Sequence, residues 1–444
     1  LPQSEKPGLW AQLTVAEIDR QTVVDTLMDS GTLLDSGPEA TALNQLAVPF
    51  YARYRWHKQF ALEKTAREAV MHREYLAAAN YFRTLLREYP ADISLQFDLA
   101  GIYSRFGQLG REASLYEEID AVGGDFPGLA EARQRNELKR QPRAAVGYGY
   151  LREEGRGGYK AIRKAWEGAS LQYSPYLQHD LEVHLARLDY QDPGSHAKIL
   201  GNRALVSYAA NINEQLLLRG GAGAELLENS RPDTTLVELA AEGRLGDRLT
   251  GILSYGRDVK HDTLASLGRN IVQQDYKVDF VLDMVPSIQA GGGYLYSDFS
   301  DDNIMRGYDL WAAYLLFFEP AFLKFSYAYD FKDTAEGRKG GPLQPDGFGA
   351  ADHPYWTPMN YWQNRFSVYF KHQLSDDQFR RGVPRYYDLE YAVVYDEMGY
   401  AMQTWKGGFF VEYAPEVILS ATAELTSGAE YRAKEFFLSA VYRW

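Results

Sequence analysis

The chain has 444 residues, of which 14% are aromatic, and its formal net charge is −13 at pH 7. The acidic balance argues against a nucleic-acid-binding protein, because recognition of a phosphate backbone requires clustered positive charge. The sequence contains no cysteine, which excludes disulfides, thiolate metal sites and a cysteine nucleophile.

The two parts of the chain differ in the spacing of their apolar residues. Residues 11–140 follow a helical period, whereas residues 144–444 alternate between apolar and polar side chains. Pro142 marks the boundary, since proline cannot continue a helix. We therefore predict a helical domain over residues 1–142 and a β-domain over residues 143–444.

The helical part contains a repeat with a period of 34 residues. In this repeat Tyr75, Ala79 and Phe82 return as Leu109, Ala113 and Tyr116. The pattern covers residues 60–122 and resembles about two tetratricopeptide repeats, in which small residues let paired helices pack closely. A generic helical hairpin domain is the alternative. Two repeats alone bury little surface, so we expect them to pack against residues 15–50, against a partner or against the β-domain.

The β-domain is a series of short runs with large apolar side chains on one face. In the run 323–331, Phe325 and Tyr327 fall on one face, and Lys324 and Asp330 fall on the other. The last run follows the same rule and ends in Trp444. Such runs are typical of bacterial outer-membrane β-barrels, whose strands face hydrocarbon on one side and the lumen on the other. No run approaches the roughly eighteen apolar residues that a membrane-spanning helix needs.

The connections between these runs alternate between short and long, as periplasmic turns and extracellular loops do in such barrels. We predict about sixteen strands, with fourteen or eighteen as alternatives. An even number returns the last strand to the side of the helical domain, which is then periplasmic. The predicted fold is a short tetratricopeptide-like α-helical domain followed by an antiparallel transmembrane β-barrel of about sixteen strands. A soluble β-sandwich is the alternative.

Acidic side chains outnumber basic ones at the positions that the alternation turns toward the lumen. One interpretation is an acidic path for a positively charged polymer, with binding weak enough to permit transport. The other is that these acids pair with bases on neighbouring strands and stiffen the wall. The candidates for a lumenal substrate path are Asp388, Glu390, Asp396, Glu238, Glu242, Asp275, Asp279 and Asp330.

The longest connection, residues 332–360, is rich in glycine and proline, which excludes regular structure. It holds or adjoins aromatic residues that a purely solvated loop would not need: Phe348, Tyr355, Trp356 and Trp362. The loop either folds into the mouth of the barrel as a gate whose aromatics stack on sugar rings, or caps the rim by burying the same aromatics.

Nothing in the sequence points to catalysis, a metal or a cofactor. The eight histidines are scattered without metal-ligand spacing, and there is no phosphate-binding loop. An outer-membrane hydrolase built from Glu182, His184 and Ser207 is an alternative, although neighbouring polar residues are ordinary in a lumen. We predict no enzyme activity, no catalytic residues, no metal and no cofactor.

The order of parts, tetratricopeptide-like helices followed by a barrel of about sixteen strands, resembles the outer-membrane exporters (secretins) of synthase-dependent exopolysaccharide systems of Gram-negative bacteria. These systems secrete poly-N-acetylglucosamine, cellulose or Pel polysaccharide into biofilms. The resemblance implies a channel from periplasm to cell surface, with helices that dock periplasmic polysaccharide-modifying or assembly proteins. The acidic lumen favours a partially deacetylated, cationic amino-sugar polymer. Full-length members carry many more repeats, so this chain resembles a short homologue or part of a longer one.

Two other functions are compatible with the same order of parts. A surface lipoprotein assembly modifier moves folded lipoproteins to the cell surface, and it requires a laterally weak seam between first and last strands and a lumen without sugar-stacking aromatics. A passive porin with a periplasmic helical anchor would conduct ions constitutively.

Overall fold

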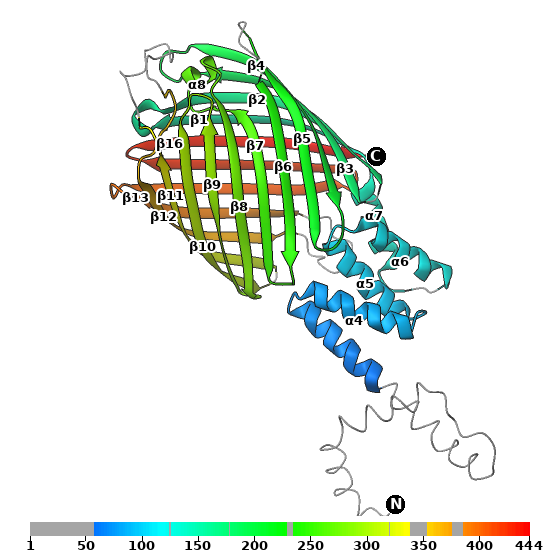
Figure 1. The fold of residues 1–444 in the computed structure, drawn as a ribbon. Coiled ribbons are helices and arrows are strands. Elements are labelled where there is room, and N and C mark those ends of the chain that lie inside the picture. The colour runs from blue at the N-terminus through cyan, green and yellow to red at the C-terminus, as the bar shows by residue number, and fades with distance from the viewer. Residues whose placement is uncertain are drawn as a thin grey trace, which may run out of the picture. The chain divides into compact units, whose positions relative to one another are not determined.

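The computed structural model describes residues 57–123, 126–176, 178–228, 234–318, 320–337, 353–374 and 385–444. It divides into two units, Leu1–Thr65 and Ala66–Trp444. Residues 57–65 of the first unit are helical, and the strands all belong to the second unit (Figure 1). The expected support from residues 15–50 falls outside the described residues.

Residues 66–71 of the second unit continue the helix of residues 57–65, and four further helices follow before the strands in its described part: α4 (Tyr75–Glu88), α5 (Ile93–Arg105), α6 (Leu109–Ala121) and α7 (Leu129–Arg140). α4 and α6 begin 34 residues apart, as the repeat spacing predicts (109 − 75 = 34). Ala79 and Ala113 occupy the same place in these two helices, and both are buried. None of the described helices is long and apolar enough to cross a membrane. Membership of the tetratricopeptide family stays a prediction.

The helix boundaries follow from local chemistry. Asp92 precedes α5 and accepts hydrogen bonds from the backbone N–H groups of Ser94 and Leu95 at 3.0 and 3.2 Å. These bonds satisfy two of the donors that a helix leaves free in its first turn. Gly107 and Gly128 have φ angles of 68° and 85°, which glycine adopts without steric cost. They separate α5 from α6 and begin α7.

Sixteen strands follow in the described residues. Their bounds are β1 (Arg143–Gly155), β2 (Lys160–Tyr176), β3 (His179–Gln191), β4 (Lys198–Asn211), β5 (Leu216–Leu227), β6 (Thr234–Leu245), β7 (Leu249–Val259), β8 (Val272–Val285), β9 (Ile288–Phe299), β10 (Ile304–Phe318), β11 (Ala321–Thr334), β12 (Tyr361–Gln373), β13 (Arg385–Asp396), β14 (Ala401–Ala414), β15 (Val417–Gly428) and β16 (Tyr431–Arg443). Each strand is antiparallel to its neighbours, and β1 closes the sheet against β16. The predicted helical segment followed by a closed sixteen-stranded antiparallel β-barrel is confirmed.

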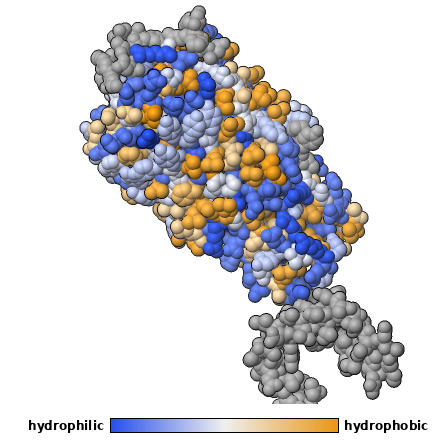
Figure 2. Space-filling model, viewed as in Figure 1, coloured by the Kyte–Doolittle hydropathy of each residue, from blue (hydrophilic) through white to orange (hydrophobic). Residues whose placement is uncertain are grey.

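The outer face of the barrel is apolar, as the alternation predicts. On β16, Leu438 and Tyr442 are exposed on the outer face, while Glu435 and Phe437 have the opposite phase. Figure 2 shows hydrophobic side chains gathered in patches over the barrel wall. Aromatic side chains pair on this face, as Tyr255 does with Tyr276 at a centroid distance of 5.0 Å. Apolar walls flanked by aromatics are typical of membrane barrels.

The two ends of the barrel differ in their connections. The connections after even-numbered strands, such as 246–248 between β6 and β7, are mostly short, and we call this the turn end. The connections after odd-numbered strands include 260–271 and 335–360, and we call this the loop end. β1 begins at the turn end, so α7 leads into the barrel there. The predicted short-and-long alternation therefore holds, apart from the eleven-residue connection 374–384 at the turn end and the two-residue connection 429–430 at the loop end.

A short helix packs inside the loop end. α8 (Leu264–Gly268) belongs to the connection between β7 and β8, and Thr263 caps it in a capping box with Ser266. The side chains of Leu264 and Leu267 are completely buried. They join inward-facing residues of the neighbouring strands in one hydrophobic cluster, which includes Ile162, Leu188, Tyr190 and Ile199. This connection therefore folds into the barrel instead of projecting away from it.

Candidate functional site: the barrel interior and its two ends

All eight acidic residues of the predicted substrate path lie on inward faces of strands. Asp388 and Glu390 flank Leu389, which is 54% exposed on the outer face of β13. Glu238 and Asp275 line an interior cavity of about 750 Å³. The alternating positions on the same strands carry side chains that are exposed on the outer face. The other four acids therefore also face inward: Asp279, Asp330, Glu242 and Asp396. Their part in transport stays a prediction.

Five of these acids form ion pairs. Glu390 pairs with Arg365 across β12 and β13 at 2.9 Å, which is the cross-strand stiffening considered as the alternative. The other four pairs are Asp279 with Lys277 at 2.8 Å, Asp330 with Lys332 at 3.0 Å, Asp396 with Arg156 at 3.5 Å and Glu242 with Arg244 at 3.7 Å. Within the described residues Glu238, Asp275 and Asp388 form no ion pair. Asp275 instead accepts a hydrogen bond from Ser297 Oγ at 2.5 Å. Three of the eight predicted acids are therefore left without a basic partner in the described part of the wall.

A lane of aromatic side chains runs along the inner wall from β10 to β14 near the turn end. Phe317 and Phe322 have ring centroids 5.0 Å apart, and Tyr369 meets Phe322 edge-on at 5.9 Å. Tyr386 and Phe410 stack at 5.0 Å. We call these five residues the aromatic lane. The sequence alone did not reveal the lane. Each of its members is a single aromatic residue among the polar, inward-facing positions of its strand, and the five residues line up only when the strand register is known.

Lysine side chains lie against the lane. Lys371 Nζ is 3.7 Å from the centroid of the Tyr386 ring, and Lys324 Nζ is 5.3 Å from that of Tyr369. A cation over an aromatic face is attracted to the ring quadrupole, so these ammonium groups help to fix the two rings. The lane thus combines aromatic rings with ammonium groups that lie over two of them, and aromatic and polar side chains together form surfaces that bind sugars.

Two connections at the loop end bond to each other. Asp262, in the β7–β8 connection, accepts a hydrogen bond from the backbone N–H of Trp356 at 3.2 Å. Thr263 Oγ1 donates to the carbonyl oxygen of Pro354 in the same segment. Asp262 also pairs with Lys160 Nζ of β2 at 2.7 Å. Burial alone would raise the pKa of Asp262, but the ammonium groups of Lys260 and Lys160 hold it below its ordinary value. Asp262 therefore stays charged and joins the two loops to the wall.

Tyr355 anchors the longer loop. Its side chain is completely buried against Phe299, with ring centroids 4.8 Å apart. Its hydroxyl donates to Asp301 Oδ1 at 2.9 Å, and His353 Nδ1 lies 2.8 Å from Asp301 Oδ2. Burial, together with the Asp301 carboxylate, raises the pKa of Tyr355, so that the hydroxyl remains a donor. The β9–β10 connection, which contains Asp301, is thereby tied to the longer loop.

Arg156 occupies an aromatic cage beside this loop. Its guanidinium carbon is 4.7 Å from the Tyr361 ring centroid, 5.1 Å from Trp356 and 5.6 Å from Tyr431. Arg156 Nη2 donates to the Tyr361 hydroxyl at 2.6 Å, and Nη1 lies 3.5 Å from Asp396 Oδ2. The cage thereby joins the β1–β2 connection to the β11–β12 connection and to the loop-end termini of β13 and β16. No sequence signal singled out Arg156, because its partners come from positions about 200 to 275 residues later in the chain.

The four aromatics assigned to the gating loop do not share one environment. Tyr355 and Trp356 lie in the loop and take part in the closure described above. Phe348 falls outside the described residues. Trp362 is a correction, because it belongs to β12, where it pairs in register with Phe331 on the outer face. The loop ends at residue 360, and alternation then turns Trp362 away from the lumen.

The structure also brings together a group that the histidine spacing did not indicate. One ligand atom each of Glu225, Asp258 and His261 lie within 4.8 Å of one another. Arg203 already pairs with both carboxylates, at 3.4 Å to Glu225 and 2.9 Å to Asp258. Tyr190 donates a further hydrogen bond to Glu225 at 2.9 Å. The positive charge of Arg203 fills the role that a metal ion would have, so this group fits an ion-pair network better than a metal site.

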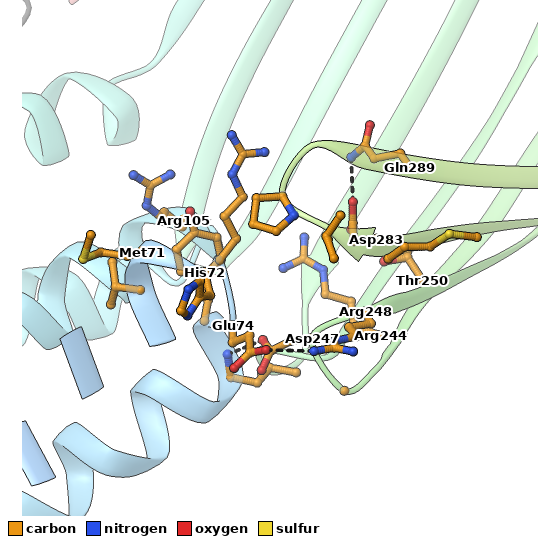
Figure 3. Close-up of a pocket in the computed structure, with 18 of the residues that line it drawn as sticks. Met71, His72, Glu74, Arg105, Arg244, Asp247, Arg248, Thr250, Asp283 and Gln289 are labelled. Carbon is orange, nitrogen blue, oxygen red and sulfur yellow. Dashed lines mark hydrogen bonds and ion pairs between the residues drawn. The ribbon is translucent and has the colours of Figure 1, made fainter. Parts of the chain in front are cut away.

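At the turn end, the barrel caps a helix of the helical domain (Figure 3). Asp247, in the turn between β6 and β7, accepts hydrogen bonds from the backbone N–H groups of Leu76 and Ala77 at 2.6 and 3.0 Å. These N–H groups belong to the first turn of α4, whose own N-cap residue Glu74 makes no side-chain cap. Glu74 instead pairs with Arg248 at 3.1 Å. A carboxylate at this position satisfies free donors and favours the positive end of the helix dipole.

Further contacts join the helices to the turn end. Glu214, in the β4–β5 turn, pairs with Arg83 of α4 at 2.5 Å and also with Arg111 of α6. Arg73 lies over the Phe317 ring at 4.2 Å, and so connects the start of α4 with the first member of the aromatic lane. A cleft of about 1040 Å³ remains between the helices and the barrel turns, and its lining includes Arg105 and Arg244 (Figure 3).

No family model and no curated protein matches the sequence. A solved structure of a bacterial polysaccharide outer membrane secretin aligns with 69% of this chain and 99% of its own, at a TM-score of 0.53 and 10% identity. OpdO of Pseudomonas aeruginosa aligns over 68% and 96%, at a TM-score of 0.36 and 10% identity. The monoaromatic hydrocarbon channel CymD aligns over 72% and 93%, at 0.32 and 12%. The similarity to the secretin is one of fold, and the other two superpose too loosely to say more.

Proposed function

We propose that the protein is an outer-membrane channel that exports an exopolysaccharide from the periplasm to the cell surface. The observation that carries this proposal is the aromatic lane inside a closed barrel, which begins beside the helices at the turn end. The apolar outer wall supports placement across the membrane. Short turns are periplasmic and long loops extracellular in such barrels, so the turn end and the helices face the periplasm.

The aromatic lane suits a sugar chain better than a folded protein or a small solute. Sugar rings have apolar faces that stack on aromatic side chains, while their hydroxyl groups bond to polar neighbours such as Lys371 and Asp388. Several weak stacking sites in a row let a polymer move by exchanging one site for the next. A single tight site would instead hold it, which transport does not tolerate.

The charge of the lumen favours a cationic cargo, a partially deacetylated amino-sugar polymer. Glu238, Asp275 and Asp388 form no ion pair in the described part of the wall and are available to ammonium groups on the polymer. The cleft at the turn end carries arginines, among them Arg73 and Arg105. Neutral and anionic oligomers are therefore the necessary controls for the charge of the cargo.

The loop end acts as the gate, and the helices act as the docking platform. The connection 335–360 is joined to 260–271 through Asp262, to the β9–β10 connection through Tyr355 and to the β1–β2 connection through Arg156, so one concerted release would open this end. α4 to α7 lie at the periplasmic mouth, where polysaccharide-modifying or assembly proteins would deliver the chain.

Two observations count against a lipoprotein translocator. β1 and β16 pair without interruption from Arg143 opposite Arg443 to Gly155 opposite Tyr431, so the seam that would have to open sideways is complete. The lumen also contains the aromatic lane, which such a translocator does not need. A passive porin differs from an exporter in having no gate, and conductance distinguishes the two.

The test is single-channel conductance of the refolded protein in planar bilayers. The intact protein is compared with a variant that lacks residues 342–358, in the presence of glucosamine, N-acetylglucosamine and uronic acid oligomers. A quiet intact channel, opened by the deletion and then blocked by glucosamine oligomers, is the expected result. Block by uronic acid oligomers alone would overturn the cationic cargo. An intact channel that is always open and indifferent to all three sugars would identify a passive porin.

A further inference from the structure

Three polar side chains interrupt the apolar outer wall of the barrel. Glu167 on β2, Arg187 on β3 and Asn202 on β4 are opposite one another in register, and all three are exposed. On β2 and β4 the outward positions before and after the row are apolar. They are Ala165 and Ala169 on β2, and Leu200 and Ala204 on β4. The row therefore lies within the apolar belt on β2 and β4, whereas on β3 the next outward residue is Asp189, which pairs with Lys198 at 2.7 Å.

The row itself, Glu167, Arg187 and Asn202, is part of the lining of a groove of about 620 Å³ on the outer wall. Small residues line its floor, among them Ala169, Ala204 and Ala224. Val146 and Leu185 stand at its sides, and they are 59% and 56% exposed. Small residues let a second wall approach closely, and close approach is what drives association where lipid is as apolar as the side chains.

The two charges of the row lack partners. Neither Glu167 nor Arg187 forms an ion pair in the part of the chain that the structure describes, and a charged residue facing hydrocarbon is costly. A group of opposite charge on a neighbouring protein would remove this cost.

We propose that two copies of this protein associate side by side through this face, with Glu167 of each copy paired with Arg187 of the other. The inference depends on the membrane placement proposed above, but not on the cargo. Two copies in one membrane share the same orientation, so a twofold axis between them must be normal to the membrane. An axis between β2 and β3 brings Glu167 opposite the second Arg187, and Ala169 opposite the second Leu185. One patch is thereby complementary to itself, as a twofold interface requires.

Two charge reversals test this pairing. E167R and R187E each place like charges across the interface, and each should lower the association constant about tenfold or more. An equimolar mixture of the two variants should form heterodimers selectively, because each contact across the interface then joins an arginine of the E167R copy to a glutamate of the R187E copy. Native mass spectrometry of the purified full chain in detergent measures all three species. Heterodimer formation also shows that both variants are folded.

The mixture separates the proposal from its alternatives. If Glu167 pairs with Arg187 within one chain, mixing the single variants restores nothing, and that result would overturn the proposal. A wild-type protein that is monomeric and carries a phosphorylated lipid that R187E releases would overturn it in favour of a lipid site. Single-channel conductance of E167R is the second readout. If E167R no longer associates but its conductance is unchanged, the proposed function is unaffected. If export is lost while association is retained, only the proposed function is contradicted.

A cross-link provides an independent measurement in native membranes. The chain has no cysteine, so a single L185C variant reports only on the proposed face. A short bis-maleimide should link L185C into a dimer. The matched control is L310C, since Leu310 is 53% exposed on the outer wall of β10, far around the barrel. Equal cross-linking at both positions would indicate random collision and would overturn the proposal.

Discussion

The two ends of the barrel consist of the same sixteen strands but are held by different kinds of contact. At the loop end, connections from the barrel itself bond to one another through buried groups, with Asp262, Tyr355 and Arg156 at the centre. At the turn end, short turns bond to a separate set of helices through Asp247 and Glu214. The first kind closes the barrel, whereas the second attaches a domain and leaves a cleft beside it.

This difference has a consequence for how each end responds to change. The loop-end contacts are buried and depend on one another, so loss of one member leaves charged or polar groups unsatisfied. The turn-end contacts are partly exposed and act separately, and exposed ion pairs contribute little each. We therefore expect single substitutions to have large effects at the loop end and smaller, local effects at the turn end.

The largest effect is expected from Arg156→Ala. The substitution removes three cation–π contacts and a hydrogen bond to Tyr361, which together stabilise the closed cage by about 2–3 kcal/mol. The ratio of open to closed channels should then rise by roughly 30- to 150-fold. Single-channel recording measures this ratio. Arg152→Ala is the matched control, since Arg152 is exposed on the outer face of β1 and forms its ion pair with Glu154. An unchanged ratio in Arg156→Ala would show that the cage is not part of the gate.

A middle-sized effect is expected from Tyr386→Ala, which interrupts the aromatic lane near the turn end. Loss of one stacking surface should weaken block of the deletion channel by glucosamine oligomers by about 1 kcal/mol, or roughly fivefold. The concentration that halves the current gives this value directly. Tyr387→Ala serves as the control, because Tyr387 follows in the chain but faces outward. Equal weakening by both substitutions would exclude specific stacking on the lane.

An effect of similar size, but confined to a single helix, is expected from Asp247→Ala at the turn end. Removal of a carboxylate that caps a helix typically costs about 1 kcal/mol. The amides of Leu76 and Ala77 should then exchange hydrogen about fivefold faster, while barrel amides and conductance stay unchanged. Hydrogen–deuterium exchange measures this effect. Asp283→Ala is the control, since Asp283 lines the same cleft but bonds to Gln289 of the barrel. Faster exchange throughout the barrel would contradict the separation of the two ends.

Alternation and turn chemistry were sufficient to predict much of the fold. The strand count, the antiparallel order and the inward phase of acids such as Asp388 follow from a side-chain period of two, which each strand carries in its own sequence. The repeat spacing likewise placed α4 and α6, because a helical hairpin is a local structure. These features need no knowledge of which strand lies beside which.

The candidate site depended on information that the sequence does not carry locally. Ion pairing of Glu390 with Arg365 and the row from Phe317 to Phe410 follow from strand register. Trp362 was grouped with the loop aromatics because it adjoins residue 360, although alternation along β12 turns it outward. The Arg156 cage, the inward fold of α8 and the cap on α4 by Asp247 join residues up to about 275 positions apart. The sequence by itself determined the faces and the order of the strands. Only closure of the barrel decided which loops, charges and aromatics meet, because it brings distant segments to one rim.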